Sequence, residues 1–238
     1  MDGLLRGNFR SAHEPDRSEL LKMILLEAND LIQRDQFADY VRNRDKRLNL
    51  DFDSSWVNYF IIGHLVRAFP DAKFILLVRD CYTWVESIVN HMLARDIPAD
   101  VRKFMDWWFE PQTYPHKMEE QTLKENGLFS LECYLSCWKG HVTRVSEMIP
   151  SERLLLIRTH EIRDALDKVA QFLHVPRERL DDANCHLNKG TRGKHIGSLV
   201  DVTFLEDTVA RVCGEVMRRY FPEVRSVDQA YALWGYQD

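Results

Sequence analysis

The sequence predicts an α/β fold, in which helices cover both faces of a mainly parallel sheet, and two observations support this. Residues 73–78 (KFILLV) and 153–157 (RLLLI) are apolar at consecutive positions, as expected for strands that are covered on both faces. The segments before and after them carry apolar residues at helical spacing. Strands separated by helices are joined by right-handed crossovers, which make the strands parallel.

Periodicity assigns the other elements in chain order. They are strands over residues 8–13 and 47–52 and helices over residues 20–32, 56–68, 82–93, 128–149 and 165–173. Pro15 suits the first turn of the first helix. Asp53 or Ser54 is expected to cap the second helix, because these residue types are preferred at that position. No internal repeat or linker divides the chain, so we expect one domain over residues 1–238.

Composition and charge narrow the class of protein. The 238 residues include 45% hydrophobic residues and carry a formal net charge of −5 at pH 7, which fits a globular protein and argues against a general nucleic-acid binder. Five cysteines without a C-x-x-C pair are typical of a reducing compartment, and no H-E-x-x-H metal motif occurs. No apolar run approaches the ~18 residues of a membrane span. We expect a cytoplasmic protein without a metal that binds neither nucleic acid nor membrane.

Polar residues directly follow four of the predicted strands. They are His13 and Glu14, residues 51–55, Arg79 and Asp80, and residues 158–161. Ligands of open α/β sheets bind beyond the carboxyl ends of the strands, so these groups are the candidates for a functional site.

Arg79 and Ser87 form the first candidate pair. Arg79 ends the most apolar strand, and Ser87 lies eight residues later inside the next predicted helix. A guanidinium and a hydroxyl placed in this way could hold one phosphate, because Arg supplies a permanent charge and several donors. The alternative, open on spacing alone, is that Arg79 pairs with Asp80 or another acid and Ser87 bonds within its own helix.

Three segments resemble the sulfotransferase family. Residues 69–92 (FPDAKFILLVRDCYTWVESIVNHM) are similar to the family's 3′-phosphate-binding segment, in which an Arg and a Ser eight positions later hold the 3′-phosphate of PAPS (3′-phosphoadenosine 5′-phosphosulfate). Arg79 and Ser87 match this spacing. Residues 152–176 resemble a later strand, acidic loop and helix of the family, with Thr159 where many members have Tyr and His174 in place of Gly.

Residues 188–195 (NKGTRGKH) form the third segment, which resembles the family's R-K-G-x-x-G-D-W loop near the cofactor. Lys189, Gly190 and Gly193 match, and Arg192 adds a charge. Two glycines let backbone N–H groups approach a phosphate, so these four residues are expected to support cofactor binding. The alternative for this loop is a solvated basic turn.

The resemblance implies a three-layer α/β/α, P-loop NTPase-like fold that uses PAPS as the sulfuryl donor. Family members begin with a strand and a loop such as P-R-S-G-T-T, which binds the 5′ side of the cofactor, and this sequence contains no counterpart. We therefore expect that the first strand is missing, that the domain is N-terminally truncated, and that turnover by this chain is impaired, because losing one such donor can cost ~100-fold in rate.

Glu14 and His13 are the candidate catalytic residues, because similar small bacterial sulfotransferases carry an acidic residue at this place that deprotonates the acceptor. Glu14 is preferred and His13 is second. The alternative is that Glu14 begins the next helix, where a negative charge suits the helix N-terminus. The expected reaction is sulfuryl transfer from PAPS to a hydroxyl of a small molecule or sugar. A small-molecule kinase and a non-catalytic nucleotide-binding or interaction protein derived from a sulfotransferase are the alternatives.

Overall fold

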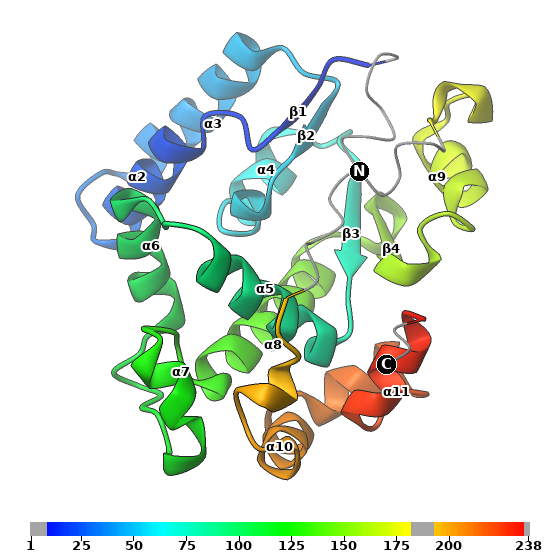
Figure 1. Cartoon of the computed structure of the whole chain (residues 1–238). Helices are drawn as coiled ribbons and strands as arrows, with labels where there is room; N and C mark the ends of the chain where they lie inside the picture. The colour runs from blue at the N-terminus through cyan, green and yellow to red at the C-terminus, as the bar shows by residue number, and fades with distance from the viewer. Residues whose placement is uncertain (1–8, 182–192, 236–238) are drawn as a thin grey trace. The chain divides into compact units, whose positions relative to one another are not determined.

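The computed structural model describes residues 9–181 and 193–235, which form an α/β protein (Figure 1). The strands are β1 (Ser11–His13), β2 (Phe52–Ser54), β3 (Phe74–Val78) and β4 (Leu154–Arg158). The helices are α2 (Arg17–Ala28), α3 (Arg34–Leu48), α4 (Ile62–Ala68), α5 (Cys81–Ala94), α6 (Ala99–Phe109), α7 (Gln121–Glu125), α8 (Leu131–Met148), α9 (Leu166–Leu173), α10 (Val202–Tyr220) and α11 (Val227–Leu233). The predictions of β3, α5, β4, α8 and α9 are confirmed.

The chain forms two compact units that are discontinuous in sequence. Unit 1 is drawn from Met1–Leu77, Val145–Ile157 and Glu161–Lys189. Unit 2 is drawn from Val78–Arg144, Arg158–His160 and Gly190–Asp238. Because the chain passes between the units several times, neither of them is a separate stretch of sequence. The expectation of one domain over the whole chain stays a prediction.

The described strands pair into two small sheets, β1 with β2 and β3 with β4. β1 and β2 run parallel, with Ser11 opposite Phe52 and His13 opposite Ser54, so both strands end at the same edge. A shared apolar cluster of unit 1 packs against residues of both sheets. It comprises the buried side chains Ile157, Ile162, Ala165, Leu166, Val169, Ala170 and Leu180, with Phe52, Ile75, Leu77 and Leu155 packed on it from the strands. The single sheet of a three-layer fold stays a prediction.

The predicted strand over residues 47–52 is wrong, because most of that segment belongs to or directly follows α3. Helix α3 exposes most of its side chains and buries only Phe37, Val41 and Arg44, which lie on one face at helical spacing. Such a polar helix gives a weak apolar signal. It ends at Asn49, whose left-handed backbone (φ 48°) lets its N–H donate to the Asp45 carbonyl (2.8 Å).

The predicted helix over residues 56–68 is divided. A short 3-10 helix, Trp56–Tyr59, comes first, and α4 follows it. The cap is Ser55, whose hydroxyl accepts a hydrogen bond from the N–H of Val57 (3.2 Å). Asp53 and Ser54, the expected caps, instead belong to β2, which extends further along the chain than the sequence pattern indicates.

Unit 2 is mainly helical, with an aromatic core. Phe109 at the end of α6 is fully buried, and its ring centroid lies 4.6 Å from that of Phe129 and 5.2 Å from that of Tyr134. Helices α10 and α11 both contact α5. Over the described residues 9–181 and 193–235, no helix has the length and apolar character needed to cross a membrane.

Candidate functional site

Asp80 makes the turn from β3 into α5, as the N-cap of the helix. One carboxylate oxygen accepts the N–H of Thr83 (2.9 Å), and the other accepts the Thr83 hydroxyl and the indole N–H of Trp234 (2.8 Å). Asp80 is 0% exposed. The cap therefore fixes the start of α5 and the direction in which the preceding residue, Arg79, leaves the strand.

Arg79 is held at both its backbone and its side chain. Its carbonyl accepts a hydrogen bond from the indole N–H of Trp138 (2.9 Å). Its Nε donates to the hydroxyl of Thr83 (2.9 Å), and its guanidinium carbon lies 4.3 Å from the ring centroid of Trp234. These contacts direct the Arg79 side chain along the α5 face that carries Thr83.

Ser87 lies on that same face. Residues three and four positions apart are neighbours on a helix surface, so Thr83, Ser87 and Asn90 form one stripe along α5. Ser87 is exposed, which leaves its hydroxyl accessible to a ligand. Arg79, through its bond to Thr83, and Ser87 therefore lie at the same side of the helix, and their binding of one phosphate stays a prediction.

Asn90 attaches the end of the Gly-rich segment to the same face. Its amide donates to the carbonyl of Lys194 (2.8 Å) and accepts the N–H of Lys194 (2.9 Å). A Cβ built on Gly193 would overlap the Asn90 side chain, so only glycine allows this approach. Next along the chain, the N–H of Ile196 donates to Glu86 (2.9 Å), again on α5.

The predicted cofactor residues are therefore partly brought together. Arg79, Ser87 and Gly193 all lie at one face of α5 within unit 2. Lys189, Gly190 and Arg192 fall outside the described residues, so their part in the site stays a prediction.

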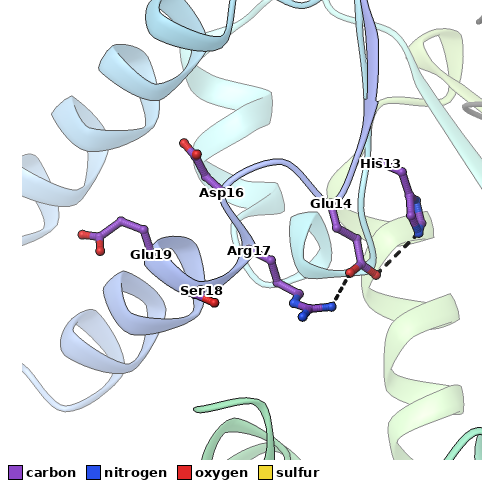
Figure 2. A pocket seen from close by; sticks show the side chains of 6 residues that line it. All are labelled: His13, Glu14, Asp16, Arg17, Ser18 and Glu19. Atoms are coloured by element: carbon purple, nitrogen blue, oxygen red, sulfur yellow. Dashed lines mark hydrogen bonds and ion pairs between the residues drawn. The ribbon is translucent and has the colours of Figure 1, made fainter. Parts of the chain in front are cut away.

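The candidate catalytic residues lie in unit 1, at the end of β1. The backbone N–H of Glu14 donates to the carbonyl of Ser54 (2.8 Å). Its carboxylate accepts a hydrogen bond from Arg17 (2.7 Å) and lies 3.8 Å from Nε2 of His13. Figure 2 shows the carboxylate of Glu14 between these two side chains. They border a hollow of about 560 Å³, whose lining residues are His13, Glu14, Asp16, Arg17, Ser18 and Glu19.

The alternative interpretation of Glu14 is that it begins the next helix. That interpretation is wrong, because the helix begins later in the chain. Helix α2 begins at Arg17 with Asp16 as its N-cap residue, and Pro15, expected in the first turn, also precedes the helix. Glu14 and Asp16 both adopt left-handed backbone conformations, with φ of 51° and 56°. Such conformations cost about 1 to 3 kcal/mol at a non-glycine residue and are concentrated at functional sites.

Arg44 holds this strained segment, which we call the β1–α2 loop (residues 14–16). Its side chain is only 5% exposed and donates to the carboxylate of Asp53 (2.7 Å) and to the carbonyl of Pro15 (2.8 Å). Arg47, one turn later on α3, pairs with Asp16. Two arginines of α3 thus fix the loop from one side, while Ser54 of β2 holds the N–H of Glu14.

Sequence reasoning missed three residues of these arrangements. Asn90 lies three positions after Ser87, and this helical spacing could have identified it. Arg44 shares the inward stripe of α3 with Phe37 and Val41, but α3 itself was not predicted. Trp234 lies far from Arg79 in the chain, and no local pattern indicates their contact. Among the described residues, no group of three or more His, Cys, Asp or Glu could hold a metal ion.

One comparison with known proteins identifies a family. The family model described as "Sulfotransferase domain" matches residues 30–184, more than half of the chain. The matched range contains Arg79 and Ser87, whereas Glu14 and the Gly-rich segment lie outside it. No curated protein matches the sequence. Because this match covers more than half of the chain, the chain belongs to the sulfotransferase family.

Proposed function

We propose that this protein transfers a sulfuryl group from PAPS to a hydroxyl of a small molecule or sugar. The observation that carries the proposal is the arrangement on α5, where Arg79, Ser87 and the Gly193 backbone share one face. A guanidinium, an accessible hydroxyl and a close glycine backbone suit a phosphate dianion. Membership of the sulfotransferase family favours the 3′-phosphate of PAPS as the phosphate that this site would hold.

The residues of the α5 face supply groups that suit a phosphate-bearing donor. Arg79 supplies a fixed positive charge, Ser87 supplies a hydroxyl donor, and the exposed Gly193 lets the backbone lie directly against Asn90. Lys189, Gly190 and Arg192 complete the proposed binding set. When bound, PAPS supplies the activated sulfuryl group, while these residues bind and orient its 3′-phosphate.

Glu14 is the proposed base that takes the proton of the acceptor hydroxyl onto its carboxylate, and His13 is the second candidate. The guanidinium of Arg17 holds this carboxylate at 2.7 Å, and the β1–α2 loop fixes its backbone. All six residues that line the hollow beside it are polar or charged. This lining supports a polar acceptor such as a sugar or polyol, because its side chains offer hydrogen bonds.

The fold and the cellular location are further parts of the proposal. We propose a three-layer, P-loop NTPase-like arrangement in one domain, supported by the apolar strands β3 and β4 between helical segments. We also propose a cytoplasmic location. Its support is chemical, since the described cysteines Cys81, Cys133, Cys137 and Cys213 are buried free thiols, as a reducing compartment favours.

A turnover assay tests the proposal. Purified protein is incubated with PAPS and a panel of sugars, polyols, alcohols and phenols, and with ATP in place of PAPS, and product formation is measured. We expect sulfation of a hydroxyl acceptor with PAPS and no transfer from ATP. Phosphoryl transfer from ATP would instead establish a kinase, and binding of PAPS without transfer to any acceptor would establish a non-catalytic protein. The measured rates also test whether turnover by this chain is impaired, as the missing N-terminal loop predicts.

Substitutions test the roles proposed for the donor-binding and catalytic residues. Arg79→Ala and Ser87→Ala should weaken donor binding, whereas Arg42→Ala on α3 and Ser151→Ala should leave it unchanged. Glu14→Gln should lower the turnover rate by about 100-fold without weakening donor binding. Glu152→Gln, an exposed glutamate of unit 1, is its matched control. If Glu14→Gln and His13→Gln are both fully active, neither residue is the catalytic base.

A further inference from the structure

We propose that Trp234 is a positioning residue that holds Arg79 in the orientation that binds the 3′-phosphate. The inference rests on the proposed function, and it assigns a role to a residue that lies outside the matched family region. Trp234 directly follows α11 and belongs to unit 2, as Arg79 does.

Trp234 closes a ring of contacts around Arg79. Its indole ring lies against the guanidinium at 4.3 Å, and its Nε1 donates to Asp80 (2.8 Å). Asp80 in turn accepts from Thr83, and Thr83 accepts from Nε of Arg79 (2.9 Å). Asp80 and Thr83 are 0% and 1% exposed. Each member of the ring thus limits the movement of the next, and the indole covers one face of the guanidinium.

The position of α11 is itself fixed on α5. The hydroxyl of Tyr231 donates to Glu86, which also accepts the N–H of Ile196 (2.9 Å). Ser226 caps the start of α11 by accepting the N–H of Gln229 (3.2 Å), and the N–H of Val227 donates to Glu206 of α10 (3.0 Å). Glu86 therefore links α11 with the segment that follows Gly193. The helix that precedes Trp234 and the segment that follows Gly193 are thus both attached to Glu86.

This arrangement reduces the entropy that phosphate binding costs. An arginine side chain has many rotamers, and ordering it on binding weakens affinity. Trp234 and Thr83 order Arg79 before the ligand arrives. Because the effect passes through Arg79, it concerns the 3′-phosphate and not the adenosine or the 5′-phosphate.

Selectivity between two nucleotides tests this role. Titration calorimetry compares adenosine 3′,5′-bisphosphate (PAP) with adenosine 5′-phosphate (AMP) for the wild type, Trp234→Ala and Trp234→Phe. We expect Trp234→Ala to weaken PAP binding roughly tenfold and to leave AMP binding unchanged. Trp234→Phe, which keeps a ring but loses the bond to Asp80, should give a smaller loss. Trp107→Phe, a tryptophan that packs on Phe104, is the matched control and should bind both nucleotides as the wild type does.

A double variant completes the test. In an Arg79→Ala background, Trp234→Ala should cause no further loss of PAP affinity, because the residue it positions is gone. Equal losses for PAP and AMP, or unchanged binding of both, would overturn the positioning role while the proposed function stands. A wild-type protein without preference for PAP over AMP would instead refute the proposed function, and this inference with it. Circular dichroism of each variant checks that the fold is retained.

Discussion

The two candidate regions are held in place by different means. On α5 the positions of Thr83 and Ser87 follow from the regular geometry of one helix, and Arg79 precedes its N-cap Asp80. The β1–α2 loop of unit 1 instead carries left-handed backbone at Glu14 and Asp16 and is fixed by side chains from another helix. The difference teaches that one helix can align most of a proposed binding surface, with distant residues such as Trp234 supporting only Arg79, whereas the loop that presents the proposed base depends on distant residues for its whole strained shape.

Arg44 should show the largest effect on stability. Arg44→Met removes a nearly fully buried charge and leaves Asp53 and the Pro15 carbonyl without this partner, so we expect the free energy of unfolding to fall by about 3 kcal/mol. Arg42→Met on the same helix removes an exposed pair with Asp39 and should cost less than about 1 kcal/mol. Urea unfolding measures both. Equal losses would mean that the loop does not depend on the buried arginine.

His141 should make the stability of unit 2 depend on pH. Burial lowers the pKa of His141 on α8 to about 4, below the ordinary value of 6.5. Between these values the unfolded chain binds a proton that the folded chain does not, so stability falls as pH drops from about 6.5 to 4. We expect a loss of about 2 kcal/mol at pH 4.5 that His141→Gln removes. The same acid loss in His141→Gln would show that another group causes it.

Gly193 tests how closely the Gly-rich segment approaches α5. In Gly193→Ala the new methyl overlaps Asn90, so we expect a cost of about 1 to 2 kcal/mol and weaker PAP binding. Asn90→Gly in the same chain should restore part of the stability, since it removes the overlap. Gly214→Ala lies inside α10, where its Cβ would meet only the end of the Arg218 side chain (3.3 Å), and serves as the control. Thermal unfolding and calorimetry compare the variants, and wild-type values for Gly193→Ala would contradict the close approach.

Substitution of Glu14 by glycine should change stability and activity in opposite directions. Glu14→Gly relieves the positive φ, so we expect the free energy of unfolding to rise by up to about 1 kcal/mol while turnover is lost. Asp16→Gly relieves the neighbouring residue but also removes its pair with Arg47, and it keeps the proposed base. Unfolding curves and rates are measured on both. A Glu14→Gly protein that is both less stable and fully active would show that the strain has no functional purpose.

The sequence predicts the part of the fold that depends on local pattern. The apolar run of β3 and the periodicity of α5 locate both elements within one residue, because buried strands and amphipathic helices have strong signals. The spacing of Arg79 and Ser87 then places them on one helix face. Gly193 was assigned from its motif, and the structure adds the reason, which is the contact with Asn90.

Other features could not be predicted because their causes are distant in sequence. Helix α3 presents only Phe37 and Val41 as apolar inward residues, and its third inward residue is the charged Arg44. The left-handed backbone of Glu14 has no sequence signal, since glutamate rarely adopts it. Trp234 reaches Arg79 only through the folded arrangement of α10 and α11 on α5. Local patterns contain none of this information.

A crystal structure with adenosine 3′,5′-bisphosphate tests the central claim most directly. The account predicts that the 3′-phosphate contacts the guanidinium of Arg79 and the hydroxyl of Ser87, with the Gly193 backbone beside it. A 3′-phosphate bound elsewhere, with Arg79 and Ser87 making no contact to it, would contradict the assignment of this face as the donor site.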